Sequence, residues 1–253
     1  MVLKTVPFQG CFRRLIDMRS WDSETVVIWL EDDFHHFGLT VVHDGTMVRD
    51  VRSVSLRTPW TSCRSAVEPL RALIGQPLVA RPSDVGRLIE MRLQCTHLFD
   101  LAGLALAHAL DGREHRRYHA TVEKVGAPDE YRRRAVLRQD EAPVMTWELT
   151  GASDIVGPAP YAGHSTDRGF REWSESMELR EAERAFVLRR AVFVSGGRTI
   201  VYDGSLTAAD VEVAAVCHAY QPTQRPLGIR YGTHIVPHDA GPEGMLSQVN
   251  TKP

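Results

Sequence analysis

Four runs of β-branched and aromatic residues in the first sixty positions constrain the fold more than any other feature of the sequence. Turn residues such as Asp44-Gly45 separate these runs, which is typical of strands joined by hairpins. Strands with such short connections pair in antiparallel fashion. We therefore expect an antiparallel meander whose strands span residues 11–17, 24–32, 35–43 and 46–57.

A helical pattern follows the meander. Apolar residues recur at helical spacing across residues 84–110, and this is the strongest helical signal in the chain. A shorter helix is expected before it, because Ser65 and Glu68 can form a capping box and the helical pattern then runs to about Leu73. The positions that indicate the long helix are Leu88, Met91, Cys95, Leu98, Ala102 and Ala105.

The second half of the sequence predicts that the sheet continues. Residues 114–126 and 130–139 have the composition of strands, and residues 181–194 have that of an amphipathic helix. Residues 151–165 are rich in glycine and proline without any period, so they predict a long loop that could close over a site.

Together these elements predict an α+β fold. We expect a curved antiparallel sheet or partial barrel with the long helix packed across it. Residues 1–240 are expected to form a single α+β domain, and residues 241–253 a C-terminal tail.

Composition excludes several classes of protein. With 43% hydrophobic and 25% charged residues the chain can bury a real core, so disorder is not expected. Thirty basic residues stand against 32 acidic ones, which argues against a surface that binds nucleic acid through overall charge. The sequence has neither a signal-peptide pattern nor an apolar run that suits a membrane span, so we expect a cytoplasmic protein that does not bind membranes. The four cysteines lie far apart and indicate neither a disulfide framework nor a structural zinc site.

No local catalytic signature is present, so any site must be assembled from separate segments. His97 and Asp100 are three residues apart on the predicted long helix, where a carboxylate can orient an imidazole that acts as a base. The alternative is a core histidine and a surface acid. Arg57 precedes Thr-Pro-Trp at a strand end and could bind a carboxylate or phenolate beside the Trp60 ring. The alternative is that Arg57 pairs with an acid of its own fold and Trp60 fills the core.

One face of the strand at 114–126 carries Tyr118 and Lys124 in phase, so a phenol and an amine could face a cavity. This pattern is less specific than the two pairs above. The run Arg132-Arg133-Arg134 is more typical of a solvated face than of a substrate site.

The stretch EDDFHHFG at residues 31–38 sets three carboxylates beside two histidines. Imidazole and carboxylate ligands suit zinc or iron, but adjacent strand positions point to opposite faces, so one site can receive only one histidine of the pair. We therefore expect a hairpin that delivers one histidine to a pocket, without a metal. His35 is favoured over His36, because its face also carries the apolar Phe37.

Several of these segments resemble a bacterial family catalogued as domain of unknown function 2889. The resemblance is carried by EDDFHHFGLTVVHDGTMVRDV, LRTPWTSC, PLRALIGQPL and CTHLFDLAGLALAHA in this order, and it covers residues 11–110 best. The later segments RGFREWSESMEL and EAERAFVLRRAVFVSGGR are also similar to that family. Members occur in bacteria that degrade aromatic compounds.

The resemblance implies a cofactor-independent lyase that acts on lignin-derived phenolic aromatic dimers, as phenylcoumaran-type formaldehyde lyases do. Such an enzyme removes a hydroxymethyl group as formaldehyde, or a carboxylate as carbon dioxide, by acid/base chemistry. On this hypothesis His97 or His35 is the base, Tyr118, Lys124 or another histidine donates a proton, and Arg57 stabilises the phenolate. Substrate contacts are expected from Trp60, Asp100, Lys124 and His36.

Two other classes of function stay open from the sequence. One is a non-catalytic ligand-binding or accessory protein of an aromatic catabolic pathway, and the other is a metal-dependent hydrolase. A homodimer is also open, because the apolar residues Phe186, Val187 and Val194 of the predicted helix at 181–194 suit a dimer interface as well as a core.

Overall fold

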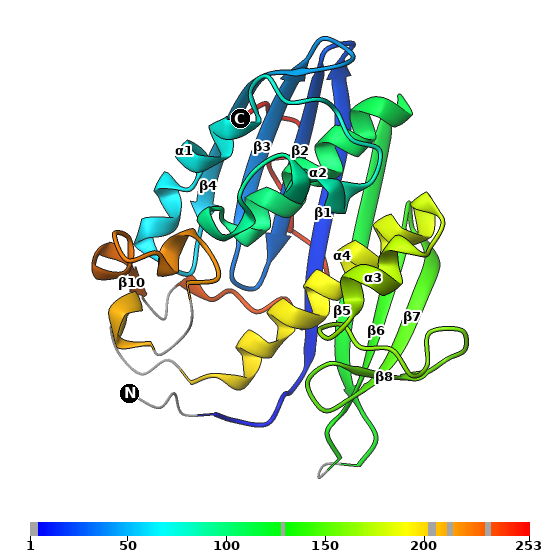
Figure 1. The fold of residues 1–253 in the computed structure, drawn as a ribbon. Helices are drawn as coiled ribbons and strands as arrows, with labels where there is room; N and C mark the ends of the chain where they lie inside the picture. Colours follow the sequence, from blue (N-terminus) through cyan, green and yellow to red (C-terminus); the bar gives the residue numbers. More distant parts are fainter. Residues whose placement is uncertain (1–4, 128–129, 202–205, 212–214, 231–233) are drawn as a thin grey trace.

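One antiparallel sheet of eight strands forms the centre of the molecule, in the order β4-β3-β2-β1-β5-β6-β7-β8 (Figure 1). The structure is a computed structural model that describes residues 5–127, 130–201, 206–211, 215–230 and 234–253. The sheet does not close, and the predicted meander is confirmed as its first four strands. The strands are β1 (Cys11–Asp22), β2 (Thr25–Asp32), β3 (His36–His43), β4 (Val48–Arg57), β5 (His115–Val125), β6 (Arg132–Gln139), β7 (Ala142–Thr150) and β8 (Asp154–Gly157).

Two helices cover the same face of the sheet (Figure 1). The helix α2 (Thr96–Asp111) packs on β1, β2 and β3, and α4 (Leu179–Ser195) packs on β5, β6 and β7. Between sheet and helices lies one large apolar core, to which the inward positions of each strand contribute. The α+β fold expected from the sequence is therefore confirmed.

The remaining elements are short. Two α-helical segments are α1 (Val67–Leu70) and α3 (Phe170–Glu175), and a separate two-stranded sheet pairs β9 (Leu206–Thr207) with β10 (Ile229–Arg230). The 3-10 helices are η1 (Thr61–Ser65), η2 (Arg71–Leu73), η3 (Pro82–Arg87), η4 (Met91–Leu93), η5 (Gly196–Thr199), η6 (Ala208–Asp210), η7 (His218–Tyr220) and η8 (Arg225–Leu227).

The long helix begins later than the periodicity predicts. Residues 82–95 form the two 3-10 turns η3 and η4 and an extended link, and the α-helix starts only at Thr96. Met91 lies at an expected core position but is 52% exposed. The chain turns here because Pro82 packs against Gly103 of α2, where an added Cβ would lie 2.3 Å from the Pro82 carbonyl oxygen.

Two further local predictions are wrong. The expected capping box at Ser65 does not form, because α1 starts after Ala66 and the Ser65 hydroxyl donates to the Ser62 carbonyl oxygen. The expected loop at 151–165 contains the strand β8, which extends the sheet beyond β7. No strand was predicted for β7 itself, although its residues Met145, Trp147 and Leu149 alternate inward.

The C-terminal residues lie along the face of the sheet opposite the helices. Met245 and Leu246 are buried against Leu15, Val27 and Trp29. The indole of Trp29 donates to the Thr251 carbonyl oxygen at 2.9 Å. As a result β2 is buried on both faces. The division into a domain at 1–240 and a tail at 241–253 stays a prediction.

No helix among the described residues is long and apolar enough to cross a membrane. All four cysteines are free thiols, and Cys63 and Cys95 are buried.

Candidate acid-base site

The hairpin between β2 and β3 holds two carboxylate-histidine pairs on opposite faces of the sheet. Glu31 lies opposite His36 in the strand register. One residue further along, the Asp32 amide donates to the His35 carbonyl oxygen at 2.8 Å and closes the turn. Because side chains alternate along a strand, Asp32 and His35 form an inner pair that faces the helices. Glu31 and His36 form an outer pair that faces the C-terminal residues.

Asp32 of the inner pair is a fully buried carboxylate surrounded by donors. Its Oδ1 accepts hydrogen bonds at 2.9 Å from the amides of Phe34 and His35, and the His35 Nδ1 lies at the same distance. Its Oδ2 accepts from the buried guanidinium of Arg14 on β1. Burial alone would raise the pKa of Asp32, but His35, Arg14 and these hydrogen bonds hold the pKa well below its ordinary value.

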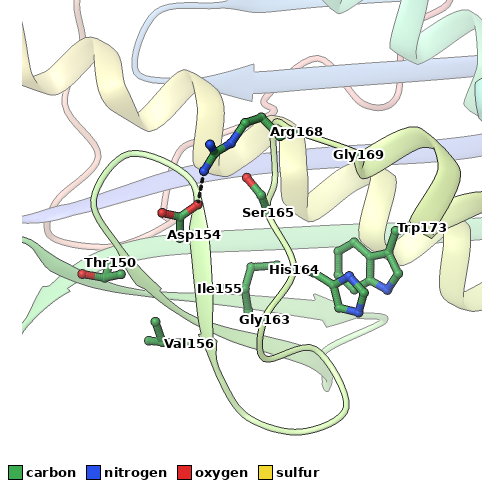
Figure 2. A pocket seen from close by; sticks show the side chains of 10 residues that line it. All are labelled: Thr150, Asp154, Ile155, Val156, Gly163, His164, Ser165, Arg168, Gly169 and Trp173. Carbon is green, nitrogen blue, oxygen red and sulfur yellow. Dashed lines mark hydrogen bonds and ion pairs between the residues drawn. The ribbon is translucent and has the colours of Figure 1, made fainter.

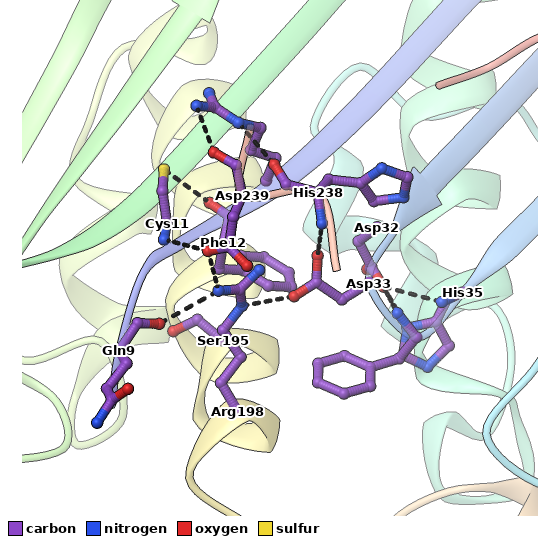
Figure 3. Close-up of polar contacts among 12 residues, drawn as sticks. Gln9, Cys11, Phe12, Asp32, Asp33, His35, Ser195, Arg198, His238 and Asp239 are labelled. Carbon is purple, nitrogen blue, oxygen red and sulfur yellow. Dashed lines mark hydrogen bonds and ion pairs between the residues drawn. The ribbon is translucent and has the colours of Figure 1, made fainter. Parts of the chain in front are cut away.

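An ionised Asp32 fixes the tautomer of His35. A carboxylate only accepts hydrogen bonds, so the His35 Nδ1 carries the proton and donates it. Burial lowers the pKa of His35 although Asp32 opposes this shift, so the ring is neutral near pH 7. A neutral ring protonated on Nδ1 leaves Nε2 as a lone-pair base (Figure 3).

His97 completes this inner site from the first turn of α2. Its ring stacks on that of His35, with centroids 3.7 Å apart and planes 28° apart. Its Nε2 is buried and has no hydrogen-bond partner among the described residues. Burial lowers the pKa of His97 far below its ordinary value, and the positive charge of Arg14 adds to this shift. Two neutral imidazoles therefore lie face to face beside an ionised carboxylate.

Asp32, His35 and His97 are also the group of described residues best placed to hold a metal. One ligand atom from each lies within 4.8 Å of the others, and two imidazoles with a carboxylate suit zinc or iron. Each imidazole lone pair lies in its ring plane, so two stacked rings cannot direct theirs to one ion about 2.1 Å away unless a ring rotates. The arrangement therefore favours acid/base chemistry over metal binding.

Asp100 does not orient His97 as the sequence suggested. Its carboxylate accepts two hydrogen bonds from Arg190 of α4, at 2.5 and 3.1 Å. This ion pair joins the two long helices. The contacts of His97 are instead with His35, with the Phe37 ring and with the side chains of Cys95 and Thr96.

Arg57 belongs to the outer pair. Its Nη2 donates to Glu31 Oε1 at 2.8 Å, so it pairs with an acid of its own fold, the alternative that the sequence left open. The same oxygen lies 3.6 Å from the His36 Nδ1 and 3.7 Å from the His238 Nε2. Burial lowers the pKa of His36, while Glu31 opposes the shift. Arg57 and His36 thus lie on the opposite face of the sheet from His35 and His97.

The other three predicted residues have surroundings of their own. Trp60 is buried in a small apolar cluster under the guanidinium of Arg230, 5.6 Å from the ring centroid. The Tyr118 hydroxyl donates to Glu183, and burial together with Glu183 raises the pKa of Tyr118. Lys124 is six residues further along β5, roughly 20 Å from Tyr118 at the rise of a strand.

Sequence reasoning missed the partners that hold the two pairs. Arg14 lies directly opposite Asp32 in the register of β1 and β2. An arginine on one strand opposite an acid on the next strand could have indicated an ion pair from the sequence. His238 had no such signal, because its approach depends on how the C-terminal residues cross the sheet.

Two pockets lie near the ends of the sheet. The hairpin pocket, about 610 Å³, lies at the tip of the β2–β3 hairpin and is lined there by Asp33 and Phe34. The Phe34 ring also meets the inner site, because its centroid lies 6.2 Å from that of His35 in an edge-on contact. The β8 pocket, about 670 Å³, lies beside β8 and contains a parallel stack of His164 on Trp173 (Figure 2).

These features define an α+β protein with a buried carboxylate-histidine site between a sheet and a helix. The segment that spans residues 12–110 matches the model of a family described as protein of unknown function (DUF2889). It contains Arg14, Asp32, His35 and His97, hence the whole inner site. A search of curated proteins found no match to the chain.

Proposed function

We propose that the protein is a cofactor-independent carbon-carbon lyase that uses the inner site for acid/base chemistry on a phenolic aromatic dimer. The observation that carries the proposal is the hydrogen bond from the His35 Nδ1 to the buried, ionised Asp32, which leaves the His35 Nε2 as a base. The class of reaction and substrate comes from the sequence resemblance. The free thiols of Cys63 and Cys95 suit a reducing cytoplasm, where we place the reaction.

The site can supply the proton transfers of a formaldehyde-releasing step. His35 takes the proton of the hydroxymethyl group, the bond from that carbon to the dimer breaks, and formaldehyde leaves. The electron pair forms a carbon-carbon double bond and expels the neighbouring aryl ether oxygen as a phenoxide. His35 then returns its proton to the phenoxide, so atoms and electrons balance without an oxidant. His97, stacked on His35, helps to exclude water from the base.

Loss of carbon dioxide from a carboxylated dimer is the second form of this proposal. It requires the same flow of electrons but no base at the start, because a carboxylate carries no proton. The Asp32-His35 pair favours the formaldehyde form, because a base is useful only for the alcohol.

The test is release of formaldehyde or carbon dioxide from phenylcoumaran-type dimers without added cofactor, with and without a chelator. We expect formaldehyde release that resists chelation and that falls by about a hundredfold or more in His35→Ala and in His97→Ala. Arg57→Ala tests whether the outer face of the sheet contributes to activity. His115→Gln, at the half-exposed end of β5, is the control. Loss of activity on chelation would instead assign the inner site to a metal.

A non-catalytic ligand-binding protein is the second candidate. The observation that favours it is that neither His35 nor His97 lines the hairpin pocket. Phe34 lines the pocket instead, and its ring contacts that of His35. Binding of aromatic dimers without release of any product would support this candidate and overturn the lyase.

A further inference from the structure

The hairpin pocket has an apolar wall and one acidic end. Its apolar wall includes Phe34, Ile200 and Ile235, and Asp239 lies at its acidic end. We propose that this pocket binds a small uncharged aromatic alcohol or phenol, whose ring packs on the apolar wall and whose hydroxyl donates to Asp239. A volume of about 610 Å³ is within the range of small-molecule sites.

The acidic end is held in place by a buried guanidinium (Figure 3). Arg198 donates from Nε to Asp33 at 2.5 Å and from Nη1 to Asp239 at 2.6 Å. The His238 amide donates to Asp33 at 3.2 Å, and the Cys11 amide donates to Asp239 at 2.9 Å. Donors from three separate segments therefore position the two carboxylates before any ligand binds, which lowers the entropic cost of binding.

Asp239 is the polar group that a ligand can reach. Its side chain is 50% exposed, whereas that of Asp33 is 1% exposed. Both hydrogen bonds to the Asp239 carboxylate end on Oδ1, and no hydrogen bond among the described residues reaches Oδ2. Partial burial favours the neutral acid, but the contacts from Arg198 and Cys11 lower the pKa of Asp239. An ionised carboxylate oxygen accepts a hydroxyl hydrogen bond and repels an anion.

Two arginines at the acidic end of the pocket are engaged in hydrogen bonds. Arg13 donates to the carbonyl oxygens of His238 and Asp239. Arg198 has one nitrogen, Nη2, without a partner among the described residues, but that atom is fully enclosed by protein. An anionic ligand therefore meets the Asp239 carboxylate before it meets a free cation.

Two glycines keep the pocket open. Gly10 has a φ of +68°, and a Cβ there would lie 1.9 Å from Asp239 Oδ1. At Gly197 a Cβ would lie 2.8 Å from the Phe34 ring. A side chain at either position would displace one of the two groups that the ligand contacts.

A pocket that prefers an uncharged alcohol favours the hydroxymethyl dimer over the carboxylated dimer as the substrate, and this conclusion about the substrate rests on the proposed function. Phe34 connects the two sites, since its ring lines the pocket and meets His35 edge-on. As a statement about binding, the inference stands without turnover.

The experiment compares 4-hydroxybenzyl alcohol with 4-hydroxybenzoate, two probes of equal size that differ in one charge. Binding to the full chain is measured by calorimetry and by ligand-observed nuclear magnetic resonance. We expect the alcohol to bind at least about tenfold more tightly, as a hydrogen bond to a charged group allows. Asp239→Asn should remove this preference. The control is Asp154→Asn, which also neutralises a half-exposed aspartate paired with an arginine, in the β8 pocket, and should keep the preference.

A second variant, Ile235→Trp, fills the pocket and should abolish binding of both probes. Tighter binding of the benzoate would overturn the inference and make Arg198 the anchor, and so would a preference for the alcohol that survives Asp239→Asn. Selective binding of the alcohol by a protein that releases no product from any dimer would overturn the lyase and leave this inference standing.

Discussion

Single buried histidines of this chain make its stability depend on pH. Burial lowers the pKa of several histidines in the folded protein, to about 4 for His108 and about 4 for His119. In the unfolded chain these rings titrate near 6.5. The unfolded state therefore binds protons first as the pH falls, so the free energy of unfolding is highest above pH 6.5 and decreases toward pH 4.

His108 on α2 is suited to a measurement of this dependence, because it is almost fully buried, with 1% of its surface exposed. The pKa shift predicts that His108→Leu lowers the loss of stability between pH 7 and pH 5 by about 2 kcal/mol. Urea unfolding at the two pH values measures this difference. The control is Leu110→Gln at an exposed position of the same helix, which removes no titratable group and should leave the pH dependence unchanged. An equal pH dependence in wild type and His108→Leu would show that the buried ring already titrates as it does in water.

At the scale of elements, the docking of α2 on the turn before it decides where His97 lies. Gly103 of α2 lies against Pro82 of η3, and Gly86 of η3 lies against the Phe99 ring of α2. The first contact has no room for a side chain, whereas the second leaves 3.5 Å between an added Cβ and the ring. Apolar spacing does not encode this close packing, and the helix starts at Thr96, later than the spacing predicts.

Gly103→Ala should therefore destabilise the protein although alanine favours helices. We expect the free energy of unfolding to fall by about 1–3 kcal/mol, because the Cβ collides with the Pro82 carbonyl and the backbone must shift. Gly86→Ala places the same methyl group at the same interface in ordinary contact and should change stability little. Urea unfolding of the two variants compares them directly, and equal stability would mean that the turn yields without cost.

The sequence predicted the first four strands more accurately than the long helix. The first four strands follow from alternation and turn residues that act locally, and the alternation of EDDFHHFG correctly separates His35 from His36. The Asp32-His35 contact is local as well. The approach of His97 to His35 is a tertiary contact between a hairpin and a helix, and no sequence pattern fixes it. For the same reason the pairing of Asp100 with Arg190 was not predicted.

At the scale of the whole molecule, the sheet is enclosed on one face by the helices and on part of the other by the C-terminal residues. Met245 and Leu246 cover Trp29, and the Leu246 amide donates to Glu31 Oε2 at 2.6 Å. These residues therefore complete both an apolar cluster and the outer pair.

Removal of residues 244–253 should expose this face. Two buried apolar side chains are lost, so the free energy of unfolding should fall by about 3 kcal/mol or more, with increased binding of an apolar fluorescent dye. The control is removal of residues 252–253, which keeps Met245, Leu246 and the Thr251 carbonyl that accepts from Trp29 in place. If both truncated proteins unfold as the full chain does, residues 241–253 act only as a tail.

The central claim is that His35, oriented by Asp32, is the base of a lyase. Its most direct test is kcat/KM for formaldehyde release from a hydroxymethyl phenylcoumaran as a function of pH, in wild type and in His35→Gln. Burial lowers the pKa of His35 below its ordinary value of 6.5, so the acidic limb of the wild-type profile should have its midpoint below pH 6.5. In folded His35→Gln activity should fall by about a hundredfold or more, and the limb should disappear. Wild-type rates in His35→Gln, or an unchanged acidic limb, would contradict the claim.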